Sequence, residues 1–222
     1  MSGLWRQALE IARKDLRTEM RSGEVLMITV PFGAAALMLI PLAIGVDAAL
    51  LDRVGPGMYW SVILLFGVLV TLRQSAADGP AQADLLTLLG LDPAARFAGR
   101  AGASALLLLV FEAVLAPIAL ALYGNDPRGW WWVLALLPLV ALGLGLLGTL
   151  GAAIAASVAS TTLVPLIVVP LSVPMLLAAT QVTEGTRVGA TTFGWLLLLV
   201  VMDLLLAVAG VLSARPLQEA AR

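Results

Sequence analysis

The sequence predicts an all-α polytopic membrane protein with six transmembrane helices, an amphipathic N-terminal helix and a short cytoplasmic helix between the second and third spans. Three observations predict this fold. Of the 222 residues, 61% are apolar and only 12% are charged, whereas soluble domains average about 45–50% apolar and about 25% charged residues. The apolar residues fall into long tracts that contain almost no charge. Lys and Arg gather between alternate tracts.

Five apolar tracts account for the six spans. They are residues 25–46, 54–72, 101–125, 129–183 and 188–212. A helix crosses a hydrocarbon core of about 30 Å in about 20 residues, so the 55 residues of the fourth tract must turn back once. The Ser and Thr cluster at 157–162 is suited to that turn. The expected transmembrane helices are therefore 25–46, 54–72, 101–123, 130–156, 163–183 and 188–212.

Lys and Arg place both chain termini in the cytoplasm, because cationic residues are retained on the inner side during insertion. With the N-terminus inside, ten of the 13 cations lie in inner segments and three in outer segments. The inner ones are Arg6, Arg13, Lys14, Arg17, Arg21, Arg73, Arg96, Arg100, Arg215 and Arg222, and the outer ones are Arg53, Arg128 and Arg187. We therefore expect a multi-pass protein of the inner or plasma membrane.

Residues 1–24 predict an amphipathic helix before the first span. Its apolar residues recur at intervals of three and four, with Arg and Glu on the other face; they are Leu4, Trp5, Ala8, Leu9, Ala12, Leu16 and Met20. Such a stripe suits the inner leaflet, where the cations reach lipid phosphates. A cytoplasmic helix that covers other parts of the same protein has the same pattern, and the sequence leaves both interpretations open.

The inner segment 73–100 is expected to carry structure of its own. Asp78-Gly79-Pro80 ends the second transmembrane helix, and residues 81–89 predict a short surface helix. Asp92 and Pro93 then suit an N-cap and the first helical position. The third long helix should therefore begin about two turns before the membrane, and the surface helix in front of it is suited to docking a partner.

Small residues line one side of the fourth span. Gly148, Ala152, Ala156 and Ser160 follow one another at intervals of four, beside a second stripe of Gly151, Ala155 and Ala159. Small side chains let helices approach closely in lipid, where packing takes the place of the hydrophobic effect. The stripes therefore predict close helix packing, either inside this bundle or against another subunit.

Three prolines, Pro165, Pro170 and Pro174, lie in the fifth span. Each removes a backbone donor and pushes against the carbonyl one turn earlier. The helix is therefore expected to be kinked or broken, with its freed carbonyls bonded elsewhere in the protein. The kink is either static or a point at which a transporter bends.

Two carboxylates, Glu112 and Asp203, lie within expected spans. A charged carboxylate at the bilayer centre costs about 2.5–3.5 kcal/mol on insertion scales, so each should face the bundle, pair with another group or take up a proton. Both are candidates for a role in a transport path or in coupling. The alternative for each is a buried structural hydrogen bond.

Aromatic residues mark the outer ends of two spans. They are Trp130, Trp131 and Trp132 at the start of the fourth span, and Tyr59 and Trp60 just inside the end of the second. Indole and phenol rings favour the headgroup boundary, which predicts that these residues anchor the helices there. Stacking of a planar hydrophobic ligand on the same rings is the alternative.

The missing residue types exclude several chemistries. The chain has no cysteine and no histidine, so it forms no disulfide, no Cys or His metal site, no Ser-His-Asp triad and no imidazole-ligated haem site. Its net charge of −1 argues against nucleic acid as a partner. The sequence also has no G-x-x-x-x-G-K-[ST] phosphate loop. If ATP drives transport, another protein must bind the nucleotide.

Three stretches carry a resemblance to a known family. The first is Pro41-Leu42-Ala43-Ile44-Gly45, followed by Leu50-Leu51-Asp52-Arg53 and Pro56-Gly57-Met58-Tyr59-Trp60. The second runs from Leu72-Arg73 through Asp78-Gly79 and Asp84-Leu85-Leu86 to Pro93 and Arg100, and the third is the run of residues 165–174. In this order they resemble CcmB, the haem exporter B family among the ABC-2 type permeases, over nearly the whole chain. Asp84 and Arg100 stand where members commonly have Glu and Lys, which keeps the charge.

The resemblance implies the permease subunit of an ABC transporter for haem export, or for ATP-driven release of a haem-loaded chaperone, in c-type cytochrome biogenesis. It implies a separate cytoplasmic ATPase like CcmA, which binds ATP-Mg, and the further partners CcmC, CcmD and the haem chaperone CcmE. Haem is then cargo, and the chain itself holds no cofactor and catalyses no reaction. A second permease copy is expected to complete a path.

In the mechanism that this resemblance implies, the ATPase docks on the inner segment and the N-terminal helix, and its closure tilts spans one, two and five against the rest. The expected docking residues are Arg73, Asp84, Leu85, Leu86, Leu88, Leu89, Arg96 and Arg100. The expected path or coupling residues are Glu112, Asp203, Pro165, Pro170 and Pro174, and the aromatics expected on the haem side are Tyr59, Trp60, Trp130, Trp131 and Trp132.

Two other functions are consistent with the same sequence. An ABC-2 type permease for another lipophilic substrate shares these mechanics and differs only in its cavity. An ion-coupled secondary transporter that uses Glu112 and Asp203 needs no ATPase. The second alternative is less favoured, because the sequence has no evident internal repeat.

Overall fold

The computed structural model describes residues 2–45, 47–76, 90–123, 130–158, 160 and 162–220. These residues form seven helices, and no strand occurs among them. Six of the helices are long and apolar enough to cross a membrane. The predicted all-α, six-span fold is therefore confirmed. The short helix expected at 81–89 lies outside the described residues.

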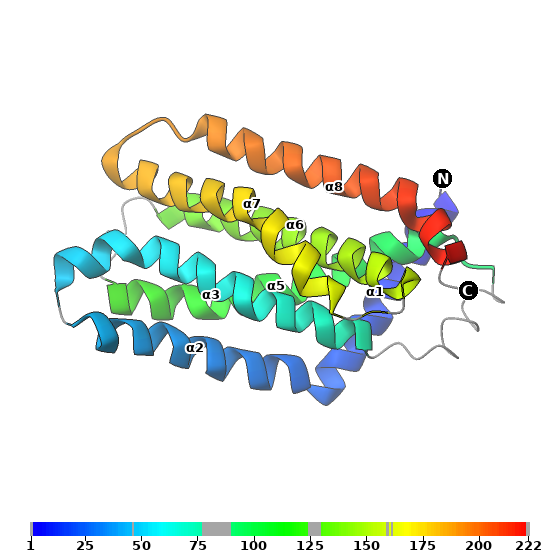
Figure 1. Cartoon of the computed structure of the whole chain (residues 1–222), viewed down its shortest axis with the longest axis horizontal. Helices are drawn as coiled ribbons and strands as arrows, with labels where there is room; N and C mark the ends of the chain where they lie inside the picture. Colours follow the sequence, from blue (N-terminus) through cyan, green and yellow to red (C-terminus); the bar gives the residue numbers. More distant parts are fainter. Residues whose placement is uncertain are drawn as a thin grey trace.

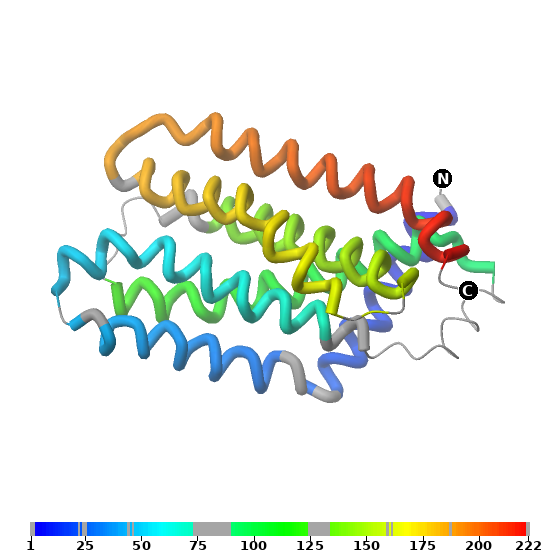
Figure 2. The backbone as a smooth tube through the Cα atoms, viewed as in Figure 1, coloured from blue at the N-terminus to red at the C-terminus, as the bar shows by residue number. Residues whose placement is uncertain are grey.

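Six long helices form an elongated bundle, and α1 crosses the end at which both termini lie (Figure 1). The backbone trace shows α2 and α8 on opposite sides, with the other spanning helices between them (Figure 2). The helices are α1 (Ser2–Ser22), α2 (Glu24–Ile44), α3 (Ala48–Ala76), α5 (Pro93–Tyr123), α6 (Trp130–Ser157), α7 (Leu163–Val188) and α8 (Phe193–Ala220).

Aspartates begin two of the helices. The Asp47 carboxylate accepts hydrogen bonds from the backbone N–H groups of Ala49 and Leu50 at 3.0 and 3.2 Å. Because this cap satisfies free donors at a helix start, α3 begins at Ala48, six residues before the expected position 54. The Asp92 carboxylate likewise accepts from the Ala94 N–H at 2.9 Å, and α5 begins at Pro93 as predicted.

The ends of α7 define the last two spans. The predicted turn at 157–162 is confirmed, since α6 ends at Ser157 and α7 begins at Leu163. At its other end α7 continues through the charged residues to Val188 and stops at Gly189, whose φ of 70° is left-handed. The sixth span is expected at 188–212, but the helix α8 begins only at Phe193. Gly189 ends α7 because glycine adopts that conformation without a steric cost.

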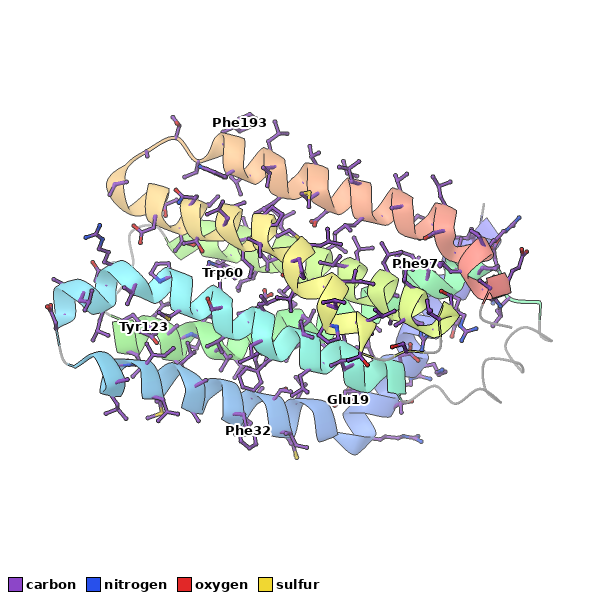
Figure 3. All side chains as sticks on the ribbon, in the orientation of Figure 1. Glu19, Phe32, Trp60, Phe97, Tyr123 and Phe193 are labelled. Atoms are coloured by element: carbon purple, nitrogen blue, oxygen red, sulfur yellow. The ribbon has the colours of Figure 1, made fainter. Side chains whose placement is uncertain are left out.

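The core lies between α3, α5, α6 and α7. Trp60 and Tyr123 point into it, whereas Phe32 of α2 and Phe193 of α8 point outward (Figure 3). Phe32 and Phe193 are 64% and 74% exposed, as expected of side chains that face lipid. The two helices at the sides of the bundle are thus its most exposed spanning helices.

Glycines of α6 bring neighbouring helices close. A Cβ at Gly145 would lie 2.8 Å from the Ala105 nitrogen and 3.0 Å from the Ala101 oxygen of α5. On the predicted small-residue stripes, Gly148 faces Thr71 of α3 and Gly151 faces Val168 of α7. These glycines therefore pack inside the bundle, which agrees with the first of the two interpretations drawn from the sequence.

Candidate functional site

Glu112 lies in the middle of the bundle. Its side chain on α5 is fully buried, and neither carboxyl oxygen has a hydrogen-bond partner among the residues that the structure describes. The backbone carbonyl of Glu112, by contrast, accepts a hydrogen bond from the Tyr59 hydroxyl of α3 at 2.9 Å. A buried polar group without a partner costs about 1–3 kcal/mol. The alternative of a structural hydrogen bond therefore finds no partner for this carboxyl in the described part of the chain.

Asp203 on α8 is also buried. Only 5% of it is exposed, and its two carboxyl oxygens also have no hydrogen-bond partner among the described residues. Its Oδ1 atom lies 2.5 Å from the point that a Cβ of Gly143 would occupy, and Met175 of α7 fills the same space. Asp203 is therefore enclosed where α6, α7 and α8 meet.

The two carboxyls lie at different depths. Phe97 of α5 packs against Gly210 of α8, and the two helices run in opposite directions (Figure 1). Asp203, seven residues from Gly210, is therefore level with about residue 104 of α5, and Glu112 lies eight residues further along that helix. At about 1.5 Å per residue, Glu112 is about 12 Å nearer than Asp203 to the bundle end away from the termini. Both unpartnered carboxyls lie within spanning helices, where an ionisable group is costly.

Tyr59 and Trp60 are core residues. Trp60 is 1% exposed, its ring meets Tyr59 edge-on with centroids 4.9 Å apart, and its Nε1–H donates to the Thr183 hydroxyl of α7 at 3.3 Å. The interpretation of this pair as anchors at the membrane boundary is wrong. Because α3 begins at Ala48, the pair lies about three turns inside the helix. The side chains of Trp130, Trp131 and Trp132 lie outside what the structure describes.

The prolines of the fifth span do not break it. Pro165 lies in the first turn of α7, while Pro170 and Pro174 lie inside a continuous helix whose course bends along its length (Figure 1). The bend agrees with the predicted kink, since an internal proline removes one helical hydrogen bond. Met175, the residue after Pro174, is fully buried and adjoins the Asp203 site.

The expected docking residues fall into two groups. Asp84, Leu85, Leu86, Leu88 and Leu89 lie outside the described residues, and so does the side chain of Arg73. Arg96 and Arg100 lie on the N-terminal part of α5 and are half-buried, and both guanidinium groups interact electrostatically with Asp15 of α1. These two arginines therefore also connect α5 with α1.

The N-terminal helix has two different apolar faces. Ala8 and Ile11 are buried against Gly99 of α5, where a Cβ would lie 2.6 Å from the Ala8 carbonyl oxygen. Trp5 and Met20 face away and are 69% and 83% exposed. One face thus covers another part of the same protein, and the second face, beside exposed arginines, is still available to an inner leaflet.

Comparison with known proteins places these features in a family. The family model described as CcmB protein matches residues 6–218. Heme exporter protein B of Haemophilus influenzae is 30% identical over 86% of this chain and 87% of its own length. Heme exporter protein B of Bradyrhizobium diazoefficiens is 31% identical, over 83% and 84% of the two chains. The protein of the same name from Paracoccus denitrificans is 29% identical, over 80% and 82%.

Proposed function

The chain belongs to the CcmB protein family, and from this membership we propose that it is the permease subunit of an ABC transporter for haem export in c-type cytochrome biogenesis. The observation that carries the proposal is the family match, which extends from α1 into α8. Release of a haem-loaded chaperone, driven by ATP, is the form of this function that best suits a chain without histidine.

The energy for this function comes from a separate protein. A CcmA-like cytoplasmic ATPase binds and hydrolyses ATP-Mg, since the sequence of the permease contains no phosphate loop. CcmC, CcmD and the haem chaperone CcmE complete the system, and a second permease copy encloses the path. The chain itself acts as a mechanical, non-catalytic subunit.

The proposed location is the inner membrane, with both termini in the cytoplasm. The distribution of Lys and Arg supports this orientation, and so does the position of both termini at one end of the bundle (Figure 1). The ATPase then docks at the end where α1 and the start of α5 lie. A groove of about 440 Å³ runs along α1 at this end, lined by Gly3, Arg6, Gln7, Glu10, Ile11, Lys14 and Leu91.

Closure of the ATPase tilts α2, α3 and α7 against α5, α6 and α8. Because α1 packs on α5 and is followed directly by α2 in the chain, a force applied to α1 acts on both of these helices. Glu112 and Asp203 lie on the second group of helices, and each residue meets the first group: the Glu112 backbone carbonyl accepts from Tyr59 of α3, and the Asp203 carboxyl lies beside Met175 of α7. These contacts between the two groups support a role of both residues in the path or in coupling.

Deletion of the gene tests the proposed function directly. We expect the deletion strain to lose haem-stained c-type cytochromes and to regain them when the intact gene is supplied in trans. The matched control is the same strain assayed for b-type cytochromes, which need no such export. Normal c-type cytochromes in the deletion strain would contradict the proposal and favour an ABC-2 type permease for another lipophilic substrate.

An ion-coupled secondary transporter is the second candidate, and the two unpartnered carboxyls are the observation that favours it. Such a protein works without an ATPase. Reconstitution of the purified chain in vesicles with an imposed proton gradient separates the candidates. Transport in the absence of any ATPase and nucleotide would support the secondary transporter and contradict the ABC mechanism.

A further inference from the structure

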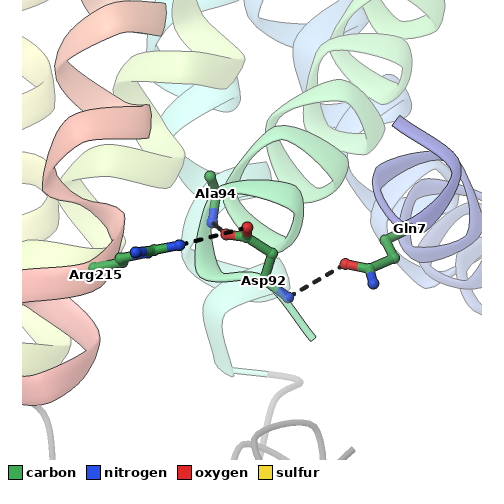
Figure 4. Close-up of polar contacts among 4 residues, drawn as sticks. All are labelled: Gln7, Asp92, Ala94 and Arg215. Atoms are coloured by element: carbon green, nitrogen blue, oxygen red, sulfur yellow. Dashed lines mark hydrogen bonds and ion pairs between the residues drawn. The ribbon is translucent and has the colours of Figure 1, made fainter. Parts of the chain in front are cut away.

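Asp92 joins three helices at the end of the bundle where the termini lie (Figure 4). Its Oδ1 atom accepts from the Ala94 N–H of α5 at 2.9 Å, and its Oδ2 atom lies 3.7 Å from an Nη atom of Arg215 on α8. Its backbone N–H donates to the side-chain oxygen of Gln7 on α1 at 3.3 Å. Its backbone carbonyl accepts the first helical hydrogen bond, from the Arg96 N–H at 3.0 Å.

Close packing holds the same three helices together beside this residue. Gly99 of α5 leaves room for the Ala8 carbonyl and the Ile11 side chain of α1. Gly210 of α8 leaves room for the Phe97 ring, and no Cβ would fit between them. Phe97 and Ala101 of α5 are buried with Ala214 of α8. The polar contacts of Asp92 thus lie beside an apolar junction between the same helices, and the two sets of contacts act together.

We infer that Asp92 is a positioning residue for coupling, which holds α1, α5 and α8 together as one rigid unit. Movement that enters α5 at its start then reaches α8 as well. The inference rests on the proposed function, in which the inner segment before α5 contacts the ATPase. Asp92 caps the start of α5, so a displacement that reaches α5 along the chain enters the helix at this residue. Helices that switch between two arrangements pass a movement from one to the next through rigid contacts of this kind.

Substitutions of Arg215 test the contact between Asp92 and α8 without disturbing the cap that Asp92 forms on α5. Arg215→Glu places a carboxylate opposite Asp92 and should lower the yield of c-type cytochromes about fivefold or more, the lower range of coupling between sites. Arg215→Lys keeps the positive charge and should retain most of the yield. Ala220→Glu adds a carboxylate to the same exposed helix end, five residues further along α8, and is the matched control. Yields are normalised to the amount of permease and of co-purified ATPase in the membrane.

The decisive variant combines Arg215→Glu with Asp92→Asn. Asparagine caps a helix as well as aspartate does, so Asp92→Asn removes the charge and retains the bond to Ala94. If repulsion between the two carboxylates causes the defect, the double variant should recover to the yield of Asp92→Asn alone. A double variant as impaired as Arg215→Glu, or an Arg215→Glu variant with normal yield, would overturn the inference while leaving the proposed function intact.

A second measurement does not depend on haem export. The chain has no cysteine, so Phe97→Cys with Gly210→Cys introduces a single thiol pair, and removal of the ring makes the space that a side chain at 210 needs. If α5 and α8 move as one unit, linking of the pair by a short bifunctional thiol reagent should be equal with and without a non-hydrolysable ATP analogue on the ATPase. A several-fold loss of linking with nucleotide would show that the unit opens, contrary to the inference.

Discussion

The Asp203 carboxyl of α8 lies directly against Gly143 of α6, with Oδ1 at 2.5 Å from the position of a Cβ on that glycine. The glycine therefore makes the space in which a carboxyl is buried between spanning helices. Met175 of α7 closes the same space, at the residue that follows a proline inside its helix. Three helices thus meet at an acidic side chain that has no hydrogen-bond partner among the described residues.

Gly143→Ala should destabilise this junction. The added methyl group would meet Met175 and Asp203, and overpacking of a filled core costs about 1–3 kcal/mol. We expect a lower melting temperature of the detergent-solubilised protein, measured by intrinsic fluorescence. Gly102→Ala on α5 is the control, because a Cβ at Gly102 meets nothing within 4 Å. Equal melting temperatures for the two variants would contradict the close packing at Gly143.

Tyr123→Phe should loosen α2. The Tyr123 hydroxyl of α5 donates to the Leu37 carbonyl of α2 at 2.9 Å, and both residues are buried. Loss of a hydrogen bond between helices in a membrane costs about 0.6 kcal/mol on average. The expected result is a small decrease in the free energy of unfolding in mixed micelles, together with faster proteolysis near α2. Tyr59→Phe, which removes the bond to Glu112 on the same helix α5, should affect stability to a similar extent without exposing α2.

Glu112→Gln tests the role of the buried carboxyl. Glutamine has nearly the same shape and no ionisable proton, so assembly with the ATPase should be preserved. If the carboxyl takes part in coupling, the yield of c-type cytochromes should decrease about tenfold, which corresponds to about 1.4 kcal/mol. Asp203→Asn is the parallel variant on α8. Normal cytochrome maturation with Glu112→Gln, at equal permease levels, would show that Glu112 has only a structural role.

Replacement of Leu85 and Leu86 by Asp tests the docking of the ATPase on the inner segment. These leucines form part of the predicted apolar face of the helix at 81–89, and a charge on that face opposes burial against a partner. We expect the ATPase to be lost from affinity pull-downs of the permease, with membrane insertion unchanged. Thr191→Asp, in the exposed connection between α7 and α8, serves for comparison. Undiminished recovery of the ATPase with the Leu85 and Leu86 variant would place the docking surface elsewhere.

Some features of the site could be predicted from local sequence, and others could not. The cap at Asp92 and the turn after Ser157 depend on residues within a few positions of each other, so the pattern alone indicated them. The burial of Tyr59 and Trp60 depends on the start of α3 at Ala48 and on Thr183, which is more than a hundred positions away. The general preference of Tyr and Trp for the membrane boundary therefore predicts the wrong position for these two rings.

The number of spans, the helical class and the two carboxyls within spans followed from the sequence by itself, because apolar length and isolated charges are local properties that decide insertion into lipid. Only the tertiary structure decided which faces pack: Gly145 on Ala105, Gly143 on Asp203, and Ile11 of α1 on Gly99. The physical reason is that lipid tails are as apolar as a protein core. Hydropathy alone therefore does not distinguish a face that contacts lipid from one that contacts another helix.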